Sequence, residues 1–114
     1  LVRSRGLGDV YKEGYELDDA AREVITKAGY GEAFIHRTGH SITTELHGSG
    51  PHLDNFETKD ERLILPGVSF SIEPGIYLRG DFGIRSEIDV YVDMNNVPEI
   101  TGGDPQQFVP ALLA

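Results

Sequence analysis

Four histidines lie close together in the chain, between His36 and His52, and no histidine occurs elsewhere. Three of them form the pattern H-x-x-G-H-x6-H through His36, His40 and His47, with Gly39 before the second histidine. An imidazole ring is neutral or charged near pH 7, so it can bind a metal ion or move a proton. The spacing alone also fits an exposed polar loop that is rich in histidine.

Two glutamates supply carboxylates that could complete such a site. Glu73 comes directly before Pro74, and a residue in that place is held in an extended conformation. Glu87 lies further along the chain, with Arg85 and Asp89 on the same face of a predicted strand. Nitrogen and oxygen ligands without thiolates are typical of Mn, Co, Fe or Zn. The residues together indicate a metal site, although for each carboxylate alone the solvent side of a strand is the more common position.

The hydrophobic pattern predicts the elements that must hold these side chains. A helix is predicted over Leu17–Ala28, and strands are predicted over Val68–Ile72 and Gly83–Val92. Short strands and loops are expected over Gly31–Asn55. Val97–Thr101 is expected to pair with the second strand as a hairpin. These elements fit the α+β fold class.

Each predicted element also has a predicted face. The helix should pack through apolar residues at helical spacing, which are Leu17, Ala20, Ala21, Val24, Ile25 and Ala28. Asp18 and Asp19 suit its positive N-terminal end, and Gly29 suits its C-terminal cap. In the strand Gly83–Val92, one face should carry Ile84, Ser86, Ile88, Val90 and Val92. Arg79, Gly80 and Asp81 are expected to form a turn, and a loop or tail is expected from Gly102 onward.

Composition excludes several kinds of function. Asp and Glu number 19 and Lys and Arg number 10, which gives a formal net charge of −9. A surface this acidic repels phosphate backbones, so we expect no nucleic-acid partner. The apolar stretches are too short to span a bilayer, so we expect no membrane association. The absence of cysteine excludes disulfides, thiolate zinc sites and a cysteine nucleophile, and it is typical of a cytoplasmic protein.

Three motifs in the chain resemble those of a known enzyme family. They are His36–Ile42 followed by His47, then Ser71–Tyr77, then Phe82–Glu87. Their order and wording resemble the pita-bread metallopeptidases, which include methionine aminopeptidase, aminopeptidase P, prolidase and creatinase. The wording H-R-T-G-H, I-E-P-G-I-Y and G-I-R-x-E is most similar to the Xaa-Pro branch, prolidase and aminopeptidase P. The fold implied is the C-terminal half of a pita-bread domain, an α+β fold with a curved, mostly antiparallel sheet and the helix packed on its outer face.

The resemblance implies a role for each candidate residue. His40 would be the single histidine ligand of the metal centre, and Glu73 a ligand that also shuttles a proton. Glu87 would bridge two metals, and Arg85 would hold that carboxylate and its neighbours in place.

The resemblance also implies the reaction. Two divalent ions would bind a bridging hydroxide that attacks a peptide bond followed by proline. Mn or Co is expected in preference to Zn or Fe. His47 would stabilise the oxygen of the tetrahedral intermediate, and His36 would lie near the substrate and the leaving group. His52 has no role that the resemblance supplies.

Two departures from the family pattern stand out. Ser41 and Thr43 occupy positions where the family usually has glycine, which narrows the space beside the site. The family also has two aspartate ligands far upstream of the histidine motif, and Asp9, Asp18 and Asp19 do not match that motif. We therefore expect residues 1–114 to form the C-terminal part of a catalytic domain, inactive without the upstream half.

Three further expectations concern the protein as a whole. The surface on which the upstream half should pack is expected to be exposed in this chain, which should make the chain prone to self-association. The intact protein is expected to be a homo-oligomer. A pita-bread domain that binds without catalysis is one alternative function. A creatinase-type amidinohydrolase is another, since the motifs disfavour it without excluding it.

Overall fold

One helix, one short 3₁₀ helix and six strands make up the computed structural model, which describes residues 11–111. In chain order they are α1 (Gly14–Lys27), η1 (Gly31–Ala33), β1 (Ser41–Ile42), β2 (Ser69–Ile72), β3 (Gly75–Tyr77), β4 (Gly83–Arg85), β5 (Ile88–Val92) and β6 (Pro98–Thr101). The strands form a four-stranded sheet in the order β1-β2-β5-β6 and a two-stranded sheet of β3 and β4. Every pairing is antiparallel, so the α+β prediction is confirmed.

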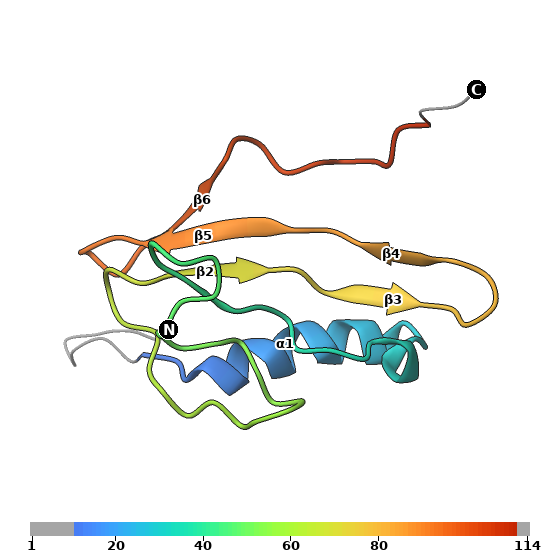
Figure 1. Ribbon diagram of the computed structural model, residues 1–114, viewed down its shortest axis with the longest axis horizontal. Helices are drawn as coiled ribbons and strands as arrows, with labels where there is room; N and C mark the ends of the chain where they lie inside the picture. Colours follow the sequence, from blue (N-terminus) through green and yellow to red (C-terminus); the bar gives the residue numbers. More distant parts are fainter. Residues whose placement is uncertain (1–10, 112–114) are drawn as a thin grey trace.

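The centre of the fold is a long hairpin that runs out through β2 and β3 and returns through β4 and β5 (Figure 1). Its turn contains Gly80, whose φ of +79° is a conformation that favours glycine. The prediction of one continuous strand over Gly83–Val92 is wrong. The structure divides this segment into β4 and β5, with Ser86 and Glu87 between them. The division lies opposite Pro74, which has no N–H to donate to the ladder. Only the Ser86 N–H reaches the Pro74 carbonyl there, at 3.4 Å.

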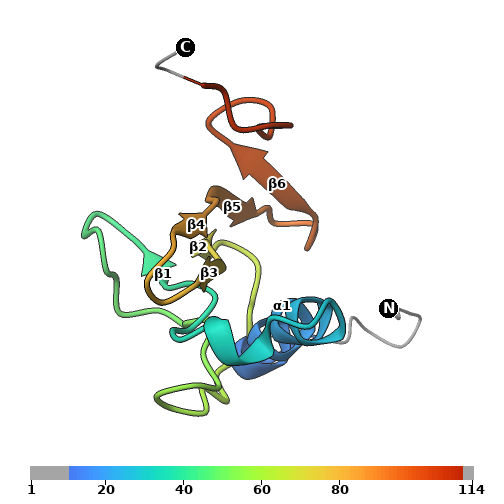
Figure 2. The ribbon, with the colours of Figure 1, turned by 90° about the vertical axis from the view of Figure 1, so that its right-hand side faces the viewer.

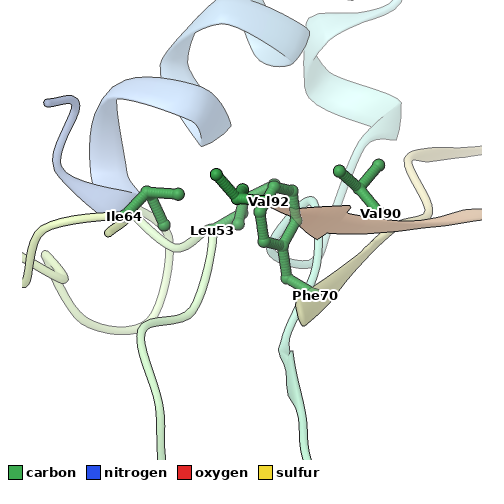
Figure 3. Packing of buried hydrophobic residues seen from close by; sticks show 5 residues of the cluster. All are labelled: Leu53, Ile64, Phe70, Val90 and Val92. Carbon is green, nitrogen blue, oxygen red and sulfur yellow. The ribbon is translucent and has the colours of Figure 1, made fainter. Parts of the chain in front are cut away.

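The hydrophobic core lies on one face of β2 and β5. Figure 3 shows the five buried side chains that meet there, which are Leu53, Ile64, Phe70, Val90 and Val92. The predicted inward direction of Val90 and Val92 is confirmed, and Ile88 packs against the same cluster. Ile84 does not follow them, because it belongs to the separate strand β4 and is 44% exposed.

Helix α1 begins three residues earlier than predicted and ends one residue earlier. The Glu13 N–H donates to the Glu16 carboxylate at 2.8 Å, so a capping box starts the helix where the apolar pattern gives no signal. At the other end Gly29 has a φ of +94° and donates to Thr26, while Tyr30 donates to Ile25. These two bonds form a Schellman motif, which confirms the predicted role of Gly29.

The predicted packing face of α1 is only partly correct. Leu17 packs against the core cluster, but Val24 is 69% exposed, and Ala20 and Ala28 are exposed as well. The fully buried side chain of the helix is Asp18, which the sequence placed in a dipole interaction at the helix end. The helix lies along one side of the hairpin, while β6 leads away on the other (Figures 1 and 2).

An apolar groove of about 430 Å³ separates α1 from the sheet. Leu17 and Ala21 line it from the helix, and Phe70, Val90 and Val92 line it from the strands.

The remaining predictions concern the C-terminal region and membranes. Val97–Thr101 was predicted to pair with the preceding strand, and β6 does pair with β5. Residues 102–111 form no helix or strand, as predicted, while residues 112–114 and Asp9 lie outside the described part of the chain. Within residues 11–111, no helix has the length and apolar character needed to cross a membrane.

Candidate active site

The histidine segment is bound tightly to the end of β2. The His40 N–H donates to Ser71 Oγ at 3.0 Å, and the Ser71 N–H donates to the His40 carbonyl at 2.9 Å. A Cβ atom on Gly39 would lie 1.8 Å from the Ser71 carbonyl oxygen, so only glycine fits there without moving the backbone. The second histidine of the motif is therefore fixed relative to the strand that leads to Glu73.

The ring of His40 is oriented for binding through one nitrogen. Its Nδ1 lies 2.9 Å from the Ser41 carbonyl, which can only accept a hydrogen bond, so Nδ1 carries the proton. In the neutral ring Nε2 then has a free lone pair, and it lies 3.2 Å from Glu73 Oε2. Two acceptor atoms at this separation fit a shared cation, because ligands at about 2.1 Å from one metal lie about 3 Å apart. The donor set therefore fits a divalent metal ion.

Glu73 and Glu87 lie at the joint between the two sheets. Ile72 pairs with Ile88 on one side of the joint and Gly75 pairs with Arg85 on the other, in one continuous register. That register places Glu73 opposite Glu87. Limited desolvation raises the pKa of the Glu87 carboxyl, although the residue is exposed, and its hydrogen bond with Asp89 and repulsion by Glu73 raise the pKa further. Opposed carboxylates are destabilising alone, so the joint favours a cation.

Arg85 lies against the same joint. Its Nη1 is 3.9 Å from Glu73 Oε1, whereas within residues 11–111 no ion pair joins it to Glu87, the carboxylate that it was expected to hold first. The remaining Glu73 oxygen faces His40, so each oxygen of this carboxylate has its own partner.

His47 lies on an exposed loop beside His40. The two rings are 4.3 Å apart between centroids, and the His47 side chain is open to solvent. Two hydrogen bonds close the loop onto β1, from the Gly48 N–H to the Ser41 carbonyl at 2.8 Å and from the Gly50 N–H to Ser41 Oγ at 3.0 Å. The serine that departs from the family pattern therefore holds the loop that carries His47.

His36 is directed away from this pair and toward β3. Its Nδ1 donates to the Arg37 carbonyl at 2.7 Å, and its Nε2 accepts from the Tyr77 hydroxyl at 2.7 Å. The ring also meets Phe34 edge to face, with centroids 5.3 Å apart. His36 is thus held by the outer half of the hairpin, whereas His40 is held by the inner half.

Sequence reasoning missed two residues, His52 and Asp60, that hold β1 in place through hydrogen bonds. His52 Nδ1 accepts the Ser41 N–H at 2.9 Å, and the Asp60 carboxylate accepts the His52 N–H at 2.8 Å. Burial lowers the pKa of the His52 ring, and the charges of Arg37 and Arg62 lower it further, which favours the neutral ring that its acceptor role requires. Burial opposes ionisation of Asp60, but hydrogen bonds from Arg62 and two backbone amides outweigh it and lower its pKa to about 2.

The predicted ligands are brought together only in part. His40 and Glu73 are in contact, and Glu87 is near enough for Glu73 to affect its pKa. Within residues 11–111, no three histidine, aspartate or glutamate side chains form a group that could hold a metal ion.

Comparison with known proteins identifies the family. The model of Metallopeptidase family M24 matches residues 9–94, which include all of the motifs described above. The chain belongs to this family. Membership implies a divalent metal cofactor, and the mixed helix and antiparallel sheet is part of the pita-bread fold.

Individual relatives agree with this assignment. The Xaa-Pro dipeptidase of Lactobacillus helveticus is 47% identical over 72 residues, which cover 63% of this chain and 18% of the relative. The structure of an Xaa-Pro dipeptidase from Bacillus anthracis superimposes with a TM-score of 0.76 at 36% identity, covering 87% of this chain and 26% of that one. An X-Pro aminopeptidase from Thermotoga maritima gives a TM-score of 0.73 at 38% identity, covering 85% and 26%. The chain thus spans about a quarter of these solved chains.

Proposed function

We propose that residues 1–114 form the C-terminal part of the catalytic domain of a metal-dependent Xaa-Pro peptidase. The observation that carries the proposal is the approach of His40 Nε2 to Glu73 Oε2 at 3.2 Å, with Glu87 opposite Glu73 in the hairpin. The names of the Lactobacillus and Bacillus relatives support a substrate with proline after the cut bond.

The proposed chemistry divides between the cofactor and the chain. Two divalent ions, with Mn or Co expected, would supply an activated water and polarise the peptide carbonyl when bound. His40, Glu73 and Glu87 would hold them through Nε2 and carboxylate oxygens. Arg85 would orient Glu73.

Two histidines would act on the substrate itself. His47, open to solvent beside His40, would donate to the carbonyl oxygen where negative charge develops. His36 would lie near the leaving group, with the Arg37 carbonyl holding the proton on its Nδ1 and Tyr77 contacting its Nε2.

The proposal extends to the complete protein. It would bind a peptide substrate, act in the cytoplasm and assemble as a homo-oligomer. The chain alone, which carries three proposed ligands, would be inactive.

The test is hydrolysis of Xaa-Pro dipeptides by the complete gene product, with and without Mn²⁺ or Co²⁺. Glu87→Gln should abolish the metal-dependent activity, because it removes a ligand while keeping the shape of the side chain. Glu99→Gln, on the exposed strand β6, is the matched control and should retain full activity. Metal binding without turnover of these dipeptides would contradict the Xaa-Pro assignment, and creatine hydrolysis would then be measured. The absence of both binding and turnover would favour a non-catalytic domain.

A further inference from the structure

The carboxylate of Asp18, on α1, is completely buried and fully hydrogen-bonded. Its Oδ1 accepts the Thr38 N–H at 3.0 Å and the Thr38 hydroxyl at 2.6 Å. Its Oδ2 accepts the Asn55 N–H at 2.6 Å. One turn along the helix, Arg22 Nη2 donates to Oδ1 at 3.1 Å. A side chain of the helix therefore binds two loops that are distant in the sequence.

Arg22 extends this network along the histidine segment. Its Nη1 donates to the Phe34 carbonyl at 3.0 Å, and its Nη2 donates to the His36 carbonyl at 2.9 Å. The guanidinium also lies over the Phe34 ring at 4.1 Å and the Phe56 ring at 5.1 Å. Backbone carbonyls and aromatic faces fix its plane, so the segment from Phe34 to Thr38 cannot shift independently of α1.

Thr38 connects the network to both ends of the His40–Glu73 contact. It lies two residues before His40, and its carbonyl accepts the Glu73 N–H at 2.7 Å. Its side chain is 1% exposed and is held by Asp18. A displacement of Thr38 would therefore change the separation of His40 Nε2 and Glu73 Oε2.

We propose that Asp18 and Arg22 are positioning residues for the metal site, acting through Thr38 to hold His40 and Glu73 at ligand separation. The inference rests on the proposed function, because it assumes that these two side chains bind metal. The pair also has a structural role, because removal of Asp18 would leave the Thr38 and Asn55 N–H groups without this acceptor, and the test must separate the two roles. The pair also fixes the position of the Thr38 segment, because its hydrogen bonds have a fixed geometry.

The test measures Mn²⁺ affinity of the complete gene product by titration calorimetry, below the unfolding temperature of every variant. Asp18→Asn is the direct variant, and Thr38→Val is a milder one that keeps the side-chain shape and removes the hydroxyl donor. We expect each to weaken Mn²⁺ binding about tenfold or more, the usual effect of losing a group that orients a ligand. Thr38→Ser retains the donor and should bind within about twofold of the unaltered protein.

Two controls separate positioning from general stability. Ile64→Val removes one methyl group from the core and lowers stability without touching the network, so its Mn²⁺ affinity should be unchanged. Glu23→Gln breaks an exposed ion pair with Lys27, which has the same spacing on α1 as Asp18 and Arg22, and should also have no effect.

The outcomes distinguish this inference from the proposed function. Unchanged affinity in Thr38→Val, or an equal loss in Thr38→Ser or Ile64→Val, would overturn the positioning role while leaving the metal site intact. A failure of the unaltered protein to bind Mn²⁺ would contradict the proposed function and the inference with it.

Discussion

The two halves of the long hairpin share one register but differ in burial. In the inner half, formed by β2 and β5, Phe70 and Val90 are 4% and 5% exposed. In the outer half, formed by β3 and β4, Ile84 is 44% exposed, and Phe82 in the adjoining turn is 60% exposed. Backbone pairing is therefore common to both halves, and core packing is not. The candidate ligands Glu73 and Glu87 lie where the packed half ends.

The largest effect should come from removing the same side chain in each half. Phe70→Ala should lower the free energy of unfolding by about 3–5 kcal/mol, because it leaves a cavity in the core. Phe82→Ala should change it by no more than about 0.5 kcal/mol, because most of that ring is already in water. Urea unfolding of the complete gene product would measure both. Equal losses would show that the outer half is as well packed as the inner half.

A second test concerns the joint between the halves, where Glu73 faces Glu87. Without metal, Glu87→Gln should raise the free energy of unfolding by about 0.2–1 kcal/mol, because it removes the repulsion between opposed carboxylates. With Mn²⁺ at about a hundred times its Kd, the unaltered protein should gain about 2.7 kcal/mol, and the variant should gain much less.

Thermal unfolding would show whether Glu87→Gln is more stable than the unaltered protein without Mn²⁺ and less stable with it. Glu99→Gln is the control. A variant that is destabilised in both conditions would show that the two carboxylates do not repel each other at the joint.

The smallest expected effect concerns Asp60, in the loop that supports β1 beside the inner half. The pKa of Asp60 is lowered to about 2 in the folded protein, compared with about 3.9 in an unfolded chain. Its stabilising contribution, on the order of 1 kcal/mol after screening by solvent, is present above about pH 4 and is lost as the pH falls toward 2. Asp60→Asn should therefore be less stable than the unaltered protein at pH 6, and the difference should disappear near pH 2.

Stability curves from pH 6 to pH 2 would measure this difference. A constant difference over that range would show that ionisation of Asp60 does not contribute.

The sequence predicts the strands well because their patterns are local. The alternation that directs Val90 and Val92 into the core is readable from neighbouring residues alone. The opposition of Glu73 and Glu87 was also accessible, although it was not recognised. Both glutamates lie seven residues from Gly80, the centre of the predicted turn, so a symmetrical hairpin places them face to face.

The contacts of Asp18 and His52, which hold the site in place, were not predictable in the same way. Asp18 was assigned to the helix terminus because its partners, Thr38 and Asn55, lie 20 and 37 residues away along the chain. No local pattern signals such a contact. His52 was left without a role for a similar reason, since its acceptor function depends on where Ser41 lies in the fold.

Gly39 has a consequence for how the family can vary. Its Cα faces the Ser71 carbonyl so closely that a methyl group would overlap it at 1.8 Å. Gly80, in the turn, has open space around it and is constrained only by its backbone conformation. In a set of diverged relatives we therefore expect asparagine, which tolerates this backbone conformation, to replace the turn glycine more readily than any residue replaces Gly39. Gly39 should persist wherever the segment before β1 still packs against Ser71 of β2, even in lineages that have lost catalysis.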